Sequence, residues 1–144
     1  MKAAVKTTGK IMGRVPQGKD LLGYLNQLCL DEKIEAGQVS AIGAVAKAKI
    51  AFYDQAKQVY DFIDFNEPLE IVSLMGNVSI KDGKPFVHAH AVFGDHAGKL
   101  LGGHLAEGTP VFACEFIITK FDSGHDLVRG FDQGTGLPLW QGLP

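Results

Sequence analysis

The stretch from Pro85 to Leu105 reads PFVHAHAVFGDHAGKLLGGHL, and it decides much of the fold. Two runs of apolar and small residues, 85–93 and 100–105, lie on either side of the segment Gly94–Gly98. Short apolar runs separated by a glycine-rich turn are typical of two antiparallel β-strands joined as a hairpin. The stretch therefore predicts a hairpin, and neighbouring segments of the chain are expected to extend the same sheet.

Further strands are predicted on both sides of this hairpin. Residues 59–65 alternate apolar and polar side chains, as a half-buried strand does. Residues 39–52 alternate with a slip at Gly43, which indicates a bulge or bend. Asp82-Gly83 is a hairpin turn that leads into Pro85. The remaining strands are predicted over residues 3–14, at an edge of the sheet, and over residues 70–80 and 111–121.

One helix is predicted near the N-terminus, where Leu21, Leu22, Leu25 and Leu28 fall on one face at helical spacing. It is expected to end before Gly37, since glycine is favoured after a helix C-terminus. The strands follow one another without alternating helices. We therefore expect an α+β fold: a curled, mostly antiparallel, barrel-like sheet of about seven strands with one main helix packed on it.

The length of 144 residues, with 46% hydrophobic and 21% charged residues, is typical of one globular domain. We expect a single domain over residues 1–144, with its core at about 8–131 and a C-terminal tail over 132–144. The tail contains Leu137, Leu139 and Trp140, so we expect it to dock on its own chain or on a neighbouring subunit.

Charge and motifs exclude several classes of protein. The net charge is −2, and only two arginines, Arg14 and Arg129, accompany twelve dispersed lysines. Strong autonomous DNA binding is therefore not expected, since DNA-binding domains usually carry a basic stripe. The sequence contains no glycine-rich phosphate loop, so we predict no nucleotide cofactor. Cys29 and Cys114 are expected to be buried free thiols, and the chain lacks an apolar leader or membrane span, so we expect a cytoplasmic protein without membrane contact.

Three histidines form the main candidate site. His88 and His90 share one face of their strand, with about 6.6–6.8 Å between their Cα atoms. If the following turn is centred on His96, His104 lies opposite His88 and points to the same face, whereas a shift of one residue would send it to the other face. All three imidazoles are then expected to converge. We assign no arginine to this site from the sequence.

Three histidines with one open position form the ligand pattern of catalytic zinc. The predicted cofactor is zinc or another divalent transition metal, with a small-molecule ligand at the metal. Glu70 and Glu115, in otherwise apolar strands, are candidate acid/base groups. The alternative is a set of hydrogen-bonded histidines that line a polar pocket or a subunit interface without metal.

Four ordered segments resemble the plants and prokaryotes conserved (PPC) domain family across most of the chain. They are Gly37–Val45, Leu69–Asn77, His88-Ala89-His90 and Gly102-Gly103-His104-Leu105. The resemblance implies a homotrimer built on a curled sheet. The plant members' AT-hook is missing here, and Pro68 replaces the arginine of their Gly-Arg-Phe-Glu-Ile-Leu motif. The fold is also similar to that of acetolactate decarboxylase, whose zinc is held by a His-x-His pair and a later histidine.

Two function hypotheses follow. The first is a member of the DNA-binding and regulatory PPC family, a homotrimeric interaction module in which the metal is a structural or sensing element. The second is a zinc-dependent enzyme, a lyase or hydrolase, that acts on a small carbonyl or carboxylate substrate.

Overall fold

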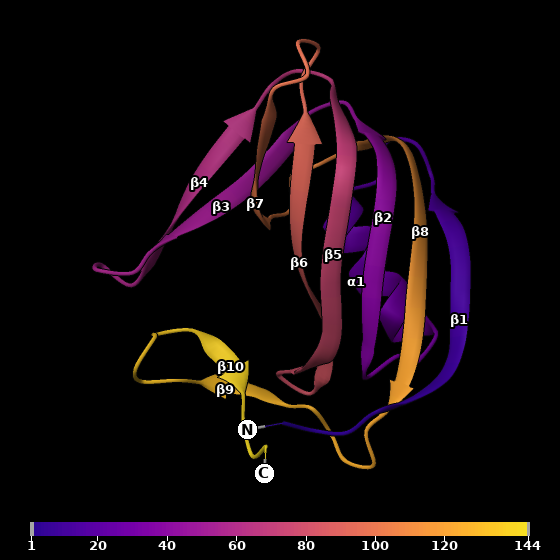
Figure 1. The fold of residues 1–144 in the computed structure, drawn as a ribbon, viewed down its shortest axis with the longest axis vertical. Coiled ribbons are helices and arrows are strands. Elements are labelled where there is room, and N and C mark those ends of the chain that lie inside the picture. Colours follow the sequence, from indigo (N-terminus) through magenta and orange to yellow (C-terminus); the bar gives the residue numbers. More distant parts are fainter. Residues whose placement is uncertain (1, 144) are drawn as a thin grey trace.

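The computed structural model describes residues 2–143 and shows one helix on a mostly antiparallel sheet, which confirms the α+β class (Figure 1). The main sheet has eight strands in the order β1-β8-β2-β5-β6-β7-β3-β4, and a separate two-stranded sheet pairs β9 with β10. The elements are β1 (Lys6–Val15), α1 (Leu21–Asp31), β2 (Gly37–Val45), β3 (Ala48–Asp54), β4 (Val59–Phe65), β5 (Leu69–Lys81), β6 (Lys84–Gly94), β7 (Leu100–Leu105), β8 (Val111–Asp122), β9 (Arg129–Phe131) and β10 (Pro138–Trp140).

The expected barrel-like sheet of about seven strands is wrong in both strand number and closure. The sheet is open, with β1 and β4 as its two edges. The physical reason lies at β3, which pairs with β7 at only two positions, Ile50↔Leu105 and Ala51↔His104, but with β4 along its whole length. The β3–β4 hairpin therefore projects from the sheet as an arm (Figure 1) and does not return to β1.

The helix α1 begins after Asp20, whose side chain accepts a hydrogen bond from Gly23 N and caps the helix N-terminus. It ends at Asp31, earlier than expected, and Lys33 takes the left-handed conformation with φ 51°. Gly37 is not the helix-terminating glycine. It begins β2, where a Cβ atom would lie 2.7 Å from the carbonyl oxygen of Thr119 on the adjacent strand. The close approach of β2 and β8 therefore explains why glycine occupies position 37.

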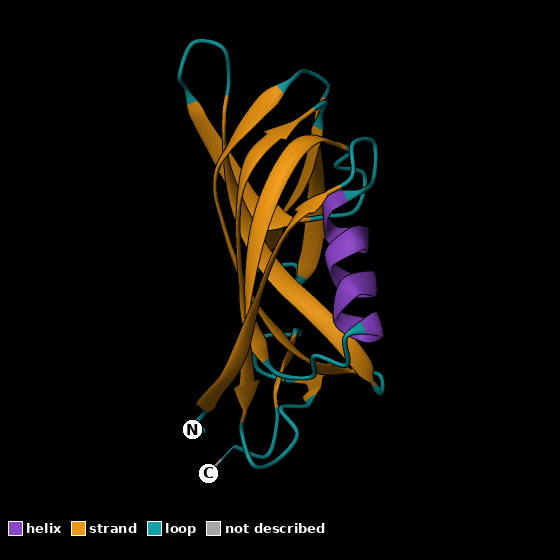
Figure 2. Ribbon diagram, turned by 90° about the vertical axis from the view of Figure 1, so that its right-hand side faces the viewer, coloured by secondary structure: helices purple, strands orange, loops and turns teal. Residues whose placement is uncertain are grey.

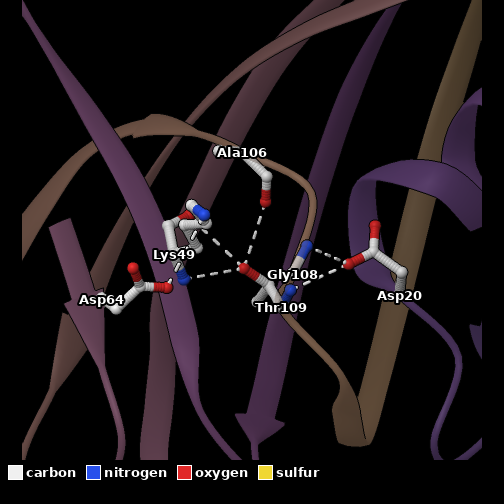
Figure 3. Close-up of polar contacts among 6 residues, drawn as sticks. All are labelled: Asp20, Lys49, Asp64, Ala106, Gly108 and Thr109. Atoms are coloured by element: carbon white, nitrogen blue, oxygen red, sulfur yellow. Dashed lines mark hydrogen bonds and ion pairs between the residues drawn. The ribbon is translucent and has the colours of Figure 1, made fainter. Parts of the chain in front are cut away.

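A partly buried polar network fixes the helix N-terminus to the sheet (Figure 3). Asp20 Oδ2 accepts hydrogen bonds from the backbone N–H groups of Gly108 and Thr109, at 2.7 and 2.8 Å. The Thr109 side chain is fully buried, accepts from Lys49 N and donates to Ala106 O. One carboxylate and one hydroxyl therefore join α1, the β7–β8 connection and β3.

The sheet has one covered face and one open face. Figure 2 shows α1 along one side of the sheet, where Leu21, Leu25 and Cys29 pack into the core. Both cysteines are buried free thiols, as expected. The opposite face carries a hollow of about 780 Å³ lined in part by exposed apolar side chains. These side chains are Met12, Ile42, Met75 and Ile117.

The C-terminal tail folds back on its own chain. The β9–β10 hairpin follows a bridge between Val128 and Ile80 at the end of β5. At its tip, Thr135 O accepts a hydrogen bond of 2.6 Å from Tyr53 Oη on the β3–β4 arm. The tail and the β3–β4 arm are therefore in direct contact. Among residues 2–143, no helix combines the length and apolarity needed to cross a membrane.

Candidate metal centre

His88, His90 and His104 converge on the open face of the sheet. His88 and His90 come from β6 and His104 from β7. Their ring centroids are 5.0–5.4 Å apart, and one nitrogen from each ring lies within 4.8 Å of the others. Met75 pairs directly with His90, which places the histidine cluster on the same face as the hollow.

The pairing differs from the expected one by two residues: His90, not His88, lies opposite His104. The turn spans residues 95–99 between the pair Gly94↔Leu100, so its centre is Ala97. Asp95 Oδ1 fixes this loop by accepting from the N–H groups of Ala97 and Lys99, and Gly98 takes φ 77°. A two-residue shift keeps every side chain on its face, which is why the convergence survives the error.

Burial and neighbouring positive charges keep two of the histidines neutral. Burial, followed by the charges of Arg129, His104 and His90, lowers the pKa of His88 to about 4. Burial, followed by the charges of His90 and Arg129, lowers the pKa of His104 to about 4. Both rings are therefore uncharged at neutral pH, the form in which imidazole binds a metal.

The donor set fits a divalent transition metal. His104 Nδ1 is buried and has no hydrogen-bond partner within the described residues 2–143, as expected of a nitrogen whose partner is a metal ion. Three nitrogens bound to tetrahedral zinc at 2.0–2.1 Å lie about 3.3 Å apart. Small side-chain rotations would bring the three histidine nitrogens from their present separations to this distance. Within residues 2–143, no thiol or carboxylate joins the three imidazoles.

Arg129, on β9, is a site residue that the sequence did not indicate. Its Nη2 lies 3.4 Å from His88 Nδ1 and donates to Asn77 Oδ1 at 2.7 Å. Its Nε donates to the buried Ser79 Oγ at 2.8 Å. The Phe86 and Trp140 rings lie 5.9 and 5.6 Å from the guanidinium carbon. The strand β9, just before the tail, therefore positions a cation beside the histidine cluster.

Tyr60, from the β3–β4 arm, forms another wall of the site. Its ring centroid is 5.1 Å from that of His104 and 5.0 Å from that of Tyr53. Burial, followed by the charge of Tyr53, raises the pKa of Tyr60 above its usual value, and the charge of Arg129 offsets part of this increase. The phenol is thus a neutral hydrogen-bonding group within electrostatic range of Arg129.

The two candidate carboxylates do not adjoin the cluster. Glu115 lies on β8, three strand spacings from β6, or about 14 Å. Glu70 pairs with Gly94, four residues along β6 from His90, or about 13 Å. Glu115 instead lines the hollow, opposite Arg14. Neither side chain is placed for proton transfer at the histidines within this chain.

Comparison with known proteins identifies the class. The sequence model of one protein family, the Plants and Prokaryotes Conserved (PCC) domain, also abbreviated PPC, matches residues 3–122. The chain therefore belongs to this family, as the four sequence segments indicated. No curated protein sequence matches the chain at a significant level.

Solved structures of high similarity support the same assignment. A metal-containing protein from Archaeoglobus fulgidus is 41% identical, with a TM-score of 0.93 over 99% of this chain and 100% of that one. A plant- and prokaryote-conserved protein from Pyrococcus horikoshii is 35% identical, with a TM-score of 0.93 over 100% and 99%. A protein from Bacteroides thetaiotaomicron described as a "putative DNA binding protein" is 25% identical, with a TM-score of 0.85 over 96% of each chain.

Proposed function

We propose that this chain is a self-associating PCC-domain module that binds one divalent transition metal ion, with zinc the first candidate, through His88, His90 and His104. One observation carries the proposal: three imidazoles converge within 4.8 Å, and a buried nitrogen among them has no hydrogen-bond partner in the part of the chain that the structure describes. The similarity to a metal-containing protein from Archaeoglobus fulgidus supports it. When bound, the ion would supply a Lewis acid with one open coordination position.

We further propose that the chain assembles as a homotrimer through the open face of the sheet. Met12, Met75 and Ile42 are 75%, 59% and 58% exposed there. A hollow lined by such side chains is typical of a surface that another protein covers. A second copy is the occupant that the family resemblance favours.

DNA binding is proposed to be weak, although two similar solved structures carry the description "putative DNA-binding protein". The net charge is −2, and the chain has only two arginines. Arg14 lies opposite Glu115, and Arg129 is engaged by Asn77 and Ser79. The phosphate backbone therefore meets no arginine-rich stripe.

A second candidate function is a zinc-dependent lyase or hydrolase that acts on a small carbonyl or carboxylate substrate. Arg129 beside the histidines favours it, since a guanidinium suits a carboxylate. Any acid/base group would have to be Tyr60 or come from a neighbouring copy, because Glu70 and Glu115 lie elsewhere. The resemblance of the three histidines to the zinc ligands of acetolactate decarboxylase also supports this second candidate.

Elemental analysis of the purified protein tests the metal site. We expect about one zinc or related ion per chain, and its loss in the His88→Ala/His90→Ala variant. The His96→Ala/His125→Ala variant is the matched control, because both of these histidines are exposed and outside the cluster. No metal in the unaltered protein, even after zinc is offered, would demote the cluster to pocket or interface residues.

A further inference from the structure

Among residues 2–143, Arg129 has hydrogen-bond acceptors but no counter-ion. Its acceptors are Ser79 Oγ, Asn77 Oδ1 and the carbonyl oxygen of Pro138, all of which are neutral. No carboxylate among residues 2–143 forms an ion pair with it. A partly buried cation without a compensating charge is unfavourable, so the structure leaves a place for an anion.

The proposed metal site increases this charge imbalance. Neutral imidazoles would leave the ion's charge of +2 uncompensated, and no carboxylate within residues 2–143 joins the three ligands. The guanidinium, whose Nη2 is 3.4 Å from His88 Nδ1, adds a further positive charge. Resting on the proposed metal site, we infer that the centre takes a small carboxylate as its ligand, held between the metal and Arg129.

The hydrogen-bonding capacity of Arg129 selects a carboxylate over a larger oxyanion. A guanidinium has five N–H donors, and three are committed to Ser79, Asn77 and Pro138. One N–H on Nη1 and one N–H on Nη2 remain uncommitted. The Nη2 atom is 3.4 Å from His88 Nδ1, a distance too long for a strong hydrogen bond. A carboxylate can place one oxygen on the metal and offer the other to such a donor, whereas a phosphate presents more oxygens than these donors can satisfy.

Cobalt(II) substitution provides a test that does not depend on enzyme activity. Acetate is titrated into the cobalt-loaded protein in a chloride-free buffer, and the visible absorption bands of the metal are followed. Acetamide, a neutral molecule of the same shape, is the control ligand. We expect acetate to shift the bands saturably and acetamide to leave them unchanged. Inorganic phosphate is a third arm, and we expect it to bind more weakly than acetate.

Variants separate the role of Arg129 from general charge and from folding. Arg129→Gln should weaken acetate binding at least tenfold while the cobalt content stays at one per chain, and Arg129→Lys should restore part of it because the charge remains. Lys81→Gln is the matched control, since Lys81 also lies over the Phe86 ring but contacts no histidine. It should bind acetate as the unaltered protein does.

The outcomes distinguish the two proposals. If cobalt bands are missing before acetate is added, the metal site itself fails and the carboxylate inference fails with it. If the bands are present but acetate and acetamide behave alike, or Arg129→Gln binds acetate normally, only the carboxylate inference is overturned. A carboxylate supplied by a neighbouring copy would show as the same lack of response to acetate. Stronger binding of phosphate than of acetate would also overturn the choice of a carboxylate.

Discussion

The protonation state of individual histidines determines whether the site can hold a cation. The sequence predicted which three residues converge: strand alternation places His88 and His90 on one face, and an assumed hairpin register, wrong by two residues, still placed His104 on that face. Their neutrality could not be predicted, since it depends on burial and on Arg129, which is 25 residues beyond the last of them. Its one available signal was the use of arginine in a chain that otherwise uses lysine.

Histidine titration in the metal-free protein checks this electrostatic account. We expect His88 and His104 to titrate near pH 4 by NMR, with pKa values well below the usual value of about 6.5. Arg129→Gln should raise the pKa of His88, but not fully to 6.5, because burial is the larger cause. A midpoint near pH 6.5 for either ring would contradict the account.

The same shifts predict the direction of the pH dependence of stability. Between pH 6.5 and 4 the unfolded chain protonates these two histidines while the folded chain does not. The free energy of unfolding of the metal-free protein should therefore be insensitive to these groups above pH 6.5 and fall as the pH drops toward 4. Urea unfolding at fixed protein concentration measures it. His88→Gln/His104→Gln should flatten the fall, and an unchanged slope would exclude this cause.

At the scale of elements, the β6–β7 hairpin shows what pattern reasoning can and cannot reach. The two strands and their shared face followed from alternation. The pairing did not, because the Asp95 side chain and the φ of Gly98 centre the turn on Ala97. Similarly, the bulge expected at Gly43 is present, with a register shift between Ala41 and Gly43 and φ 145°, whereas the helix end was placed too late because Lys33 takes the left-handed position.

Asp20 is predicted to be the most sensitive polar residue among the connections. Asp20→Ala would leave the N–H groups of Gly23, Gly108 and Thr109 without their acceptor. We expect a loss of about 1–3 kcal/mol in the free energy of unfolding, measured by urea denaturation at fixed protein concentration. Glu35→Ala, at an exposed position, is the control and should change little. Equal effects of the two substitutions would show that the network contributes nothing.

At the scale of the whole molecule, the site depends on parts of the chain that the sequence could not bring together. The arm supplies Tyr60 and β9 supplies Arg129, and the arm contacts the tail after β9 through the Tyr53–Thr135 hydrogen bond. Sequence patterns predicted a docked tail, but its position requires the fold. The sheet does not close, because β3 leaves β7 after two paired positions.

The proposed homotrimer, which the family resemblance implies, predicts the assembly state. Light scattering coupled to size exclusion should give about three times the chain mass of 15.5 kDa. Ile42→Asp/Met75→Asp should dissociate the assembly, since both side chains are exposed in the hollow. Leu30→Asp, at an exposed position of α1, should leave it intact. A stable 15.5 kDa species for the unaltered protein would reject the trimer.

The charge distribution predicts weak DNA affinity. A mobility-shift assay with duplex DNA at about 0.15 M salt should show no binding below micromolar protein concentration, because few phosphate contacts are available. Tight binding that falls steeply as salt increases would show that a basic surface forms in the assembly.

X-ray absorption at the K edge of the bound metal tests the central claim most directly, on protein that carries one ion per chain. The account predicts three imidazole nitrogens at about 2.0–2.1 Å, with the outer-shell scattering of histidine rings, and a fourth light atom. Sulfur at about 2.3 Å, or an oxygen-only shell without imidazole scattering, would contradict a centre built from His88, His90 and His104.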